Sequence, residues 1–89
     1  MYAAVMHLTF DPELASQAAS TFSNDLLPKL RTAVGFRSGY WLDPSDGKGL
    51  GLLLFDQEGQ ARHASDPQHW QAPGVAIDKI EIRRVAATA

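Results

Sequence analysis

One apolar stretch, Gly47–Phe55, constrains the fold of this chain more than any other part of the sequence. It is the only continuous apolar run, and it reads Gly-Lys-Gly-Leu-Gly-Leu-Leu-Leu-Phe. Successive side chains of an extended strand point to opposite faces of a sheet. Leucines therefore fall on both faces: Leu50, Leu52 and Leu54 on one, Leu53 with Phe55 on the other. Both faces of a sheet built on this strand need cover.

The length of the chain limits how that cover can be supplied. Eighty-nine residues, 45% of them hydrophobic, are enough for one compact domain, residues 1–89, with two short helices. Two such helices can cover only one face of a small sheet. We therefore expect the other face to pack against a second copy of the chain, which makes the protein a homodimer.

Charge and composition argue against several classes of partner. Eight Lys and Arg stand against ten Asp and Glu, and the basic residues are scattered, so neither nucleic acid nor an anionic membrane is expected to bind. The chain has no Cys, which excludes disulfides and thiolate metal sites. No apolar run approaches the ~20 residues of a membrane span, and the first residues lack the basic region of a secretion signal. We expect a soluble, cytoplasmic protein.

The first third of the chain predicts a strand followed by an interrupted helix. Tyr2–Phe10 alternates as a strand, and Asp11 with Pro12 is a typical helix start, because Asp accepts from free backbone amides and Pro fits the first turn. An apolar stripe at four-residue spacing follows: Leu14, Ala18, Phe22, Leu26 and Leu30. Pro28 has no amide hydrogen and should interrupt this helix in the preceding turn, and Gly35 suits a left-handed end.

The middle of the chain predicts a hairpin. Phe36–Leu42 alternates as a strand, and it should pair with the Gly47–Phe55 run in antiparallel fashion. Asp43–Gly47 is rich in turn-forming residues, and we expect a loop of more than two residues there.

The last third predicts a short helix and a final strand. Asp56 should cap a helix over Gln57–Ser65, which Pro67 would end. Val75–Val85 then alternates as a strand, but its apolar residues change parity part of the way along. A β-bulge near Asp78 would reconcile the two halves.

This order of elements predicts an α+β fold with ferredoxin-like βαββαβ topology, in which both helices cover one face of a four-stranded antiparallel sheet. The open face would present Val5, either Tyr40 or Trp41, and leucines of the third strand. A monomer rarely leaves so much apolar surface in water. Two such sheets packed face to face in a symmetric dimer would bury it.

Four segments of the chain resemble a known family. They are Leu27–Leu30, Gly35–Trp41, Gly49–Asp56 and His63–Pro67, and their order and spacing are similar to those of the antibiotic-biosynthesis-monooxygenase-like family of the dimeric α/β barrel superfamily. The similarity runs over nearly the whole chain. It implies a homodimer whose two sheets form a barrel, with a pocket in each subunit between sheet and helices or at the barrel mouth.

The resemblance also implies activities, but this chain departs from the residues that perform them. Oxygenases of the family use no metal or cofactor; they help to deprotonate a polyphenolic or quinol-like substrate, and the carbanion reacts with oxygen. Where they carry Asn, Trp and Tyr, this chain has Gly51, Phe55 and Ala61. Haem-degrading members of the superfamily use an Asn, a Trp and a His. At the corresponding positions this chain has no Asn in the first strand, and it has Ala64 and Gly74 in place of the other two. Neither activity carries over residue by residue, and we expect no cofactor.

The histidines are the candidate catalytic residues. His63, on the second predicted helix, is the first candidate for a general base, because imidazole titrates near neutral pH; a half-exposed surface histidine is the alternative. His7, opposite the apolar stripe of the first strand, is the second candidate, or else a hydrogen-bonded interface histidine. His63, Asp66 and His69 are three residues apart, but Pro67 interrupts the helix that would align them, so we expect no metal site.

The candidate ligand contacts are aromatic or charged side chains. Trp41 and Trp70 can stack on a flat ligand; packing at the dimer interface and anchoring of a loop are the respective alternatives. Arg37 can hold an anionic group or pair with a carboxylate. Phe55 and His69 are the other two candidate ligand contacts.

These observations support one leading hypothesis and two alternatives. The leading hypothesis is a homodimeric barrel protein that binds a small apolar or aromatic molecule. The first alternative is a cofactor-independent monooxygenase or isomerase that acts on a phenolic or polyketide-like substrate, with His63 or His7 as base. The second alternative is a structural dimerisation module whose interior is filled by its own side chains.

Overall fold

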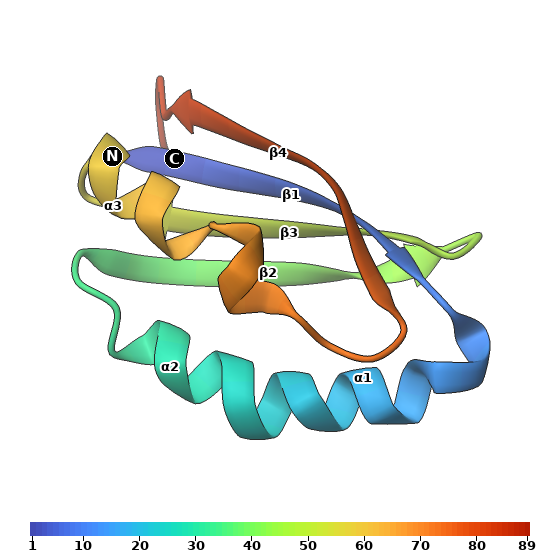
Figure 1. Ribbon diagram of the computed structural model, residues 1–89. Helices are drawn as coiled ribbons and strands as arrows, with labels where there is room; N and C mark the ends of the chain where they lie inside the picture. The colour runs from blue at the N-terminus through green and yellow to red at the C-terminus, as the bar shows by residue number, and fades with distance from the viewer.

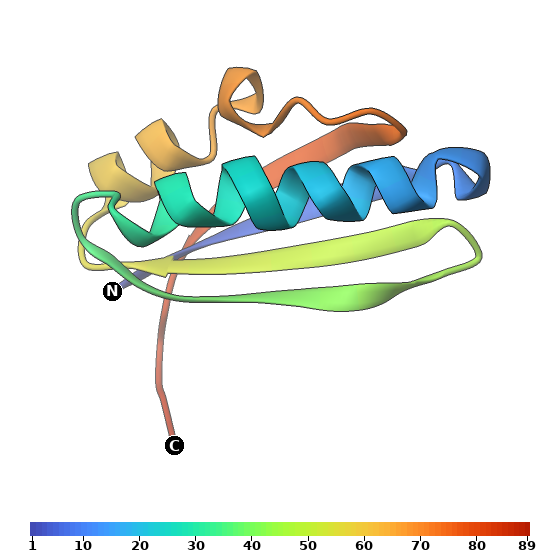
Figure 2. The same cartoon turned by 90° about the horizontal axis from the view of Figure 1, so that it is seen from below.

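A computed structural model describes all 89 residues as two layers, a sheet and a layer of helices (Figures 1 and 2). Four strands form one antiparallel sheet: β1 Tyr2–Phe10, β2 Phe36–Ser45, β3 Lys48–Phe55 and β4 Val75–Arg84. Their order in the sheet is β2-β3-β1-β4. This order, with the helices on one face, is compatible with the predicted ferredoxin-like fold. Figure 2 shows that no helix covers the opposite face of the sheet.

The first helical run changes type along its length. It consists of a 3-10 turn η1 Pro12–Leu14, α1 Ala15–Thr21, a π-helical turn η2 Phe22–Leu26 and α2 Leu27–Arg31. The Asp11 carboxylate accepts a hydrogen bond from the Glu13 amide at 3.0 Å, which confirms the predicted N-cap. The π turn lies just ahead of Pro28, where the proline cannot donate to the helical ladder. The predicted interruption is confirmed.

The hairpin between β2 and β3 is tighter than expected. β2 continues to Ser45, which pairs with Lys48, and only Asp46 and Gly47 form the turn. Both turn residues have positive φ, 52° and 76°, as a two-residue turn that follows the twist of the strands requires. The prediction of a longer loop was wrong, because Pro44 is tolerated in β2, an edge strand of the sheet.

The second helix, α3, spans Glu58–Ala64 and is capped differently from the prediction. Gln57 is the N-cap, and its backbone amide donates to the Gln60 side chain at 3.0 Å in a capping box. Asp56 does not cap the helix and instead forms an ion pair with Arg37. A short 3-10 helix, η3 Pro67–Trp70, follows. None of the helices combines the length and the apolar character that crossing a membrane requires.

β4 contains the predicted bulge. His7 pairs with Lys79 and Leu8 pairs with Ile77, so Asp78 is an extra residue without a partner in β1. The bulge returns Ile77 to the same face as Ile80, which pairs with Met6. The bulge at Asp78 therefore accounts for the change of parity among the apolar residues of β4.

The two faces of the sheet differ in what they present. On the covered face, Phe55, Met6 and Leu53 are the largest fully buried side chains. A register shift near Arg37 in β2 places Trp41 on this covered face, where it packs on Phe22, and Tyr40 on the open face. The exposed large apolar side chains of the open face are Tyr40 (56%), Leu42 (59%), Leu50 (37%) and Leu52 (36%).

Candidate functional site

An apolar cavity of about 550 Å³ lies between the sheet and the first helical run. Fourteen of its 19 lining residues are hydrophobic, so the space favours an apolar occupant. Met6 and Leu8 of β1 line it from the sheet, and Ala18 and Phe22 line it from the helices. Its volume is within the range of small-molecule sites, roughly 300–1,000 Å³.

Three aromatic rings from three different elements meet at this cavity. Phe22 lies edge-on to Trp41, with centroids 4.9 Å apart and planes at 78°, and 5.9 Å from the Trp70 ring. The two indoles are 6.3 Å apart. We call Phe22, Trp41 and Trp70 the aromatic wall. Such a wall offers faces and edges on which a flat ligand can stack.

The two indole N–H groups of the wall have different environments. Trp70 Nε1 donates to the Ala64 carbonyl at 2.7 Å, which fixes that ring. Trp41 Nε1 has no hydrogen-bond partner within the chain, and because no fully buried side-chain nitrogen or oxygen lacks a partner, it is reached by solvent. The Trp41 N–H is therefore free to donate to a bound molecule.

The cavity contains little charge. Asp43 is its one ionisable lining residue, and it is an exposed residue of β2 close to the hairpin turn. Ser23 adds a hydroxyl from the helical side. An apolar space of this kind disfavours a charged occupant, since burial of an unpaired charge is costly.

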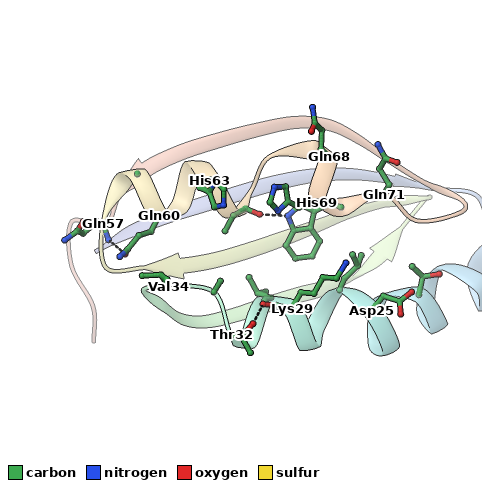
Figure 3. Close-up of a pocket in the computed structure, with 17 residues that line it drawn as sticks. Asp25, Lys29, Thr32, Val34, Gln57, Gln60, His63, Gln68, His69 and Gln71 are labelled. Carbon is green, nitrogen blue, oxygen red and sulfur yellow. Dashed lines mark hydrogen bonds between the residues drawn. The ribbon is translucent and has the colours of Figure 1, made fainter.

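A second, polar groove of about 1040 Å³ lies between α2 and the α3–η3 segment (Figure 3). Lys29 of α2 and Thr32, the residue after α2, line it from one side, and His63, Gln68 and His69 line it from the other side. The His63 and His69 rings lie 5.2 Å apart with planes at 77°. Trp70 reaches both the groove and the apolar cavity.

Neither candidate catalytic histidine contacts the apolar cavity. His63 lines the polar groove and is exposed. His7 lies on the open face of the sheet, where its Nε2 is 2.9 Å from a Glu81 carboxylate oxygen. This hydrogen bond, followed by the charge of Lys79, lowers the pKa of Glu81. The apolar cavity thus has no imidazole to act as a base.

The candidate ligand contacts divide between the cavity, the groove and the core. Trp41 and Trp70 line the apolar cavity, and His69 lines the groove. Arg37 is paired with Asp56 and lines neither space. Phe55 is fully buried, with its ring 5.6 Å from that of Phe36, and has no surface to offer a ligand.

The sequence predicts Trp41 as a ligand contact, with packing at the dimer interface as the alternative. Trp41 lies on the covered face of the sheet, among the residues that line the cavity, so it is not part of the open face. Phe22 is predicted in the apolar stripe of the helix and packs against the core as expected, and its further place in the aromatic wall is not among the predictions. A signal was present: Gly39 and Gly51, which leave space above the sheet beside Trp41, are both visible in the sequence.

The comparisons with known proteins add no family assignment. No protein-family model matches this chain, and no curated protein matches its sequence. The resemblance to the antibiotic-biosynthesis-monooxygenase-like family therefore stays a hypothesis that rests on the four segments themselves.

Proposed function

We propose that this chain is a homodimeric small-molecule-binding protein that takes up an uncharged, apolar or aromatic molecule in the cavity between sheet and helices. The observation that carries the proposal is the apolar cavity with its aromatic wall, Phe22, Trp41 and Trp70. The free Trp41 N–H favours a ligand with one hydrogen-bond acceptor, such as a phenol or a ketone oxygen.

The homodimer is supported by the chemistry of the open face. Tyr40, Leu42, Leu50 and Leu52 form an apolar patch over β2 and β3. The β4 side of the same face carries charged side chains, Lys79, Glu81 and Arg83. An exposed apolar patch with charged side chains on one side of it is common at protein–protein interfaces. We propose a second copy of the chain as the partner, because no helix is left to cover this patch.

Binding without catalysis is the simplest form of this proposal. A cofactor-independent oxygenase needs a base beside its substrate, and His63 and His7 both lie outside the apolar cavity. Oxygen uptake in the presence of hydroquinones and anthrones separates the two functions. Turnover that is lost when both histidines are replaced would favour the oxygenase, and we expect no turnover.

The binding proposal is tested with a neutral aromatic probe, 2-naphthol. Because Trp41 and Trp70 line the cavity, the probe should quench tryptophan fluorescence in a saturable way. Ala19→Phe places a ring in the cavity from the exposed side of α1 and should weaken binding at least tenfold, about 1.4 kcal/mol.

Gln17→Phe is the matched control. It makes a similar change on the same helix at an exposed position that lines neither the cavity nor the groove, so binding should stay within about twofold of wild type. Equal binding by wild type and Ala19→Phe would place the probe elsewhere and would rule out the cavity as the binding site.

A further inference from the structure

Outside the apolar cavity, the structure brings two histidines together on the α3–η3 side of the polar groove (Figure 3). His63 comes from the last turn of α3, and His69 comes from η3. Their rings are 5.2 Å apart. Proximity of two imidazoles is unexpected from the sequence, since Pro67 lies between them and breaks the helix that would align them.

The local fold explains how the break produces the pair. Asp66 caps η3 by accepting from the Gln68 amide at 3.0 Å, so that Pro67 starts a new turn in a new direction. Trp70, at the end of that turn, is buried, and its Nε1 bonds the Ala64 carbonyl of α3. This anchor folds η3 back on α3 and holds His69 beside His63.

The ring separation matches that of two imidazoles bound to one metal ion. Two histidines on a tetrahedral zinc ion, with Zn–N distances of about 2.0–2.1 Å, have ring centroids roughly 5 Å apart. Both side chains are exposed, so rotation about their side-chain bonds can aim one nitrogen of each ring at a common point. No protein hydrogen bond holds either ring in another orientation, whereas His7 is held by Glu81.

The geometry points to a two-histidine binding site, formed by His63 and His69, for a divalent transition-metal ion of the zinc, nickel or copper class. Imidazole is a preferred ligand of these ions, and Mg²⁺ and Ca²⁺ prefer oxygen ligands. No third His, Cys, Asp or Glu joins the pair in a cluster. The protein thus supplies two ligands, and water fills the other positions, which leaves the ion open to an exchangeable ligand in the groove.

Isothermal titration calorimetry with ZnCl₂ and with NiCl₂ on the untagged chain tests this site. We expect one ion per chain. His63→Gln and His69→Gln should each weaken binding at least tenfold, because either variant leaves a single imidazole. His7→Gln is the matched control, since it replaces the third and last histidine of the chain, on the open face of the sheet, and should leave binding unchanged.

A second readout does not depend on any variant. Cu²⁺ added in small amounts to the wild-type chain should broaden the imidazole NMR signals of His63 and His69 together and leave that of His7 sharp. Absence of saturable binding up to millimolar metal, equal binding by His69→Gln and wild type, or broadening of His7 as strong as that of the pair would overturn the site.

Discussion

At the scale of single residues, the indole of Trp41 lies across two glycines. A Cβ atom at Gly51 would stand 3.2 Å from its Cδ1 and Nε1, and a Cβ at Gly39 would stand 2.7 Å from Cη2. A side chain at either position would push the ring away from the sheet, in a region where Phe22 already packs against it. Glycines weaken strands in general; here they give the aromatic wall its space.

A second residue-scale feature, the His7–Glu81 hydrogen bond, predicts a pH dependence of stability. The bond from His7, followed by the charge of Lys79, lowers the pKa of Glu81 below its ordinary value of 4.5. A carboxylate with a depressed folded-state pKa stabilises the fold above its unfolded pKa, and the contribution is lost as pH falls through the folded value.

We therefore expect the melting temperature of wild type to fall more steeply below about pH 4.5 than that of Glu81→Gln, which cannot titrate. Asp78, whose pKa is also lowered, mainly by the hydrogen bond from Thr9, is present in both proteins, so the difference isolates Glu81. Thermal melts followed by circular dichroism between about pH 6 and pH 3 measure both slopes. Parallel curves would contradict the linkage.

At the scale of elements, the start of α3 is joined to the start of β2. Gly35 has φ +77°, and its carbonyl accepts from the Asp56 amide at 3.0 Å. The Gln60 side chain, which completes the capping box of α3, packs directly on Gly35 where a Cβ atom would be. One glycine thus serves both the turn after α2 and the N-terminus of α3.

Two alanine substitutions should therefore have opposite effects on stability. Gly35→Ala forces a left-handed backbone on a residue with a Cβ and displaces Gln60, and should lower the free energy of unfolding by roughly 1–2 kcal/mol. Gly59→Ala lies within α3, where no atom is near the new Cβ, and should raise it by roughly 0.5–1 kcal/mol. Urea titration measures the free energy of unfolding of both variants. A change of the same sign in both would contradict the prediction.

At the scale of the whole molecule, one face of the sheet is buried by the helices and the other is open (Figure 2). The open face holds the apolar patch of Tyr40, Leu42, Leu50 and Leu52. In β3, Leu52 pairs with Val5 of β1 and Tyr40 of β2, so it lies near the middle of that face.

Leu52→Lys should therefore weaken self-association at least tenfold, because it places a charge at the centre of the proposed interface. Sedimentation equilibrium at micromolar concentrations measures the change. Val34→Lys introduces the same side chain at a 78% exposed position outside the sheet and should leave the dimer intact. A wild-type chain that sediments as a monomer in this range would refute the dimer.

Much of the fold could be predicted from the local chemistry of the sequence. The Asp11 cap, the interruption ahead of Pro28 and the bulge at Asp78 each depend on a few neighbouring residues, and all three are confirmed. The two errors had local causes as well. Pro44 was interpreted as a turn residue although an edge strand accepts it, and Asp56 was assigned to a cap that Gln57 provides.

The candidate site was harder to predict from the sequence, because its residues are distant from one another in the chain. The aromatic wall joins residues of η2, β2 and η3, and their meeting depends on the register shift in β2 that turns Trp41 toward the helices. Similarly, His63 and His69 meet because Trp70 anchors the turn after Pro67. Neither the register nor the anchor has a signature in hydrophobic periodicity.

The sequence by itself determined the order of strands and helices and the two apolar faces of β3, because alternation, caps and turn residues act over a few positions. Only the tertiary structure decided which face Trp41 joins, that an apolar cavity remains beneath the first helical run, and that two histidines converge at the groove. These outcomes depend on how whole elements pack, and a contact between elements is set by the register and direction of both.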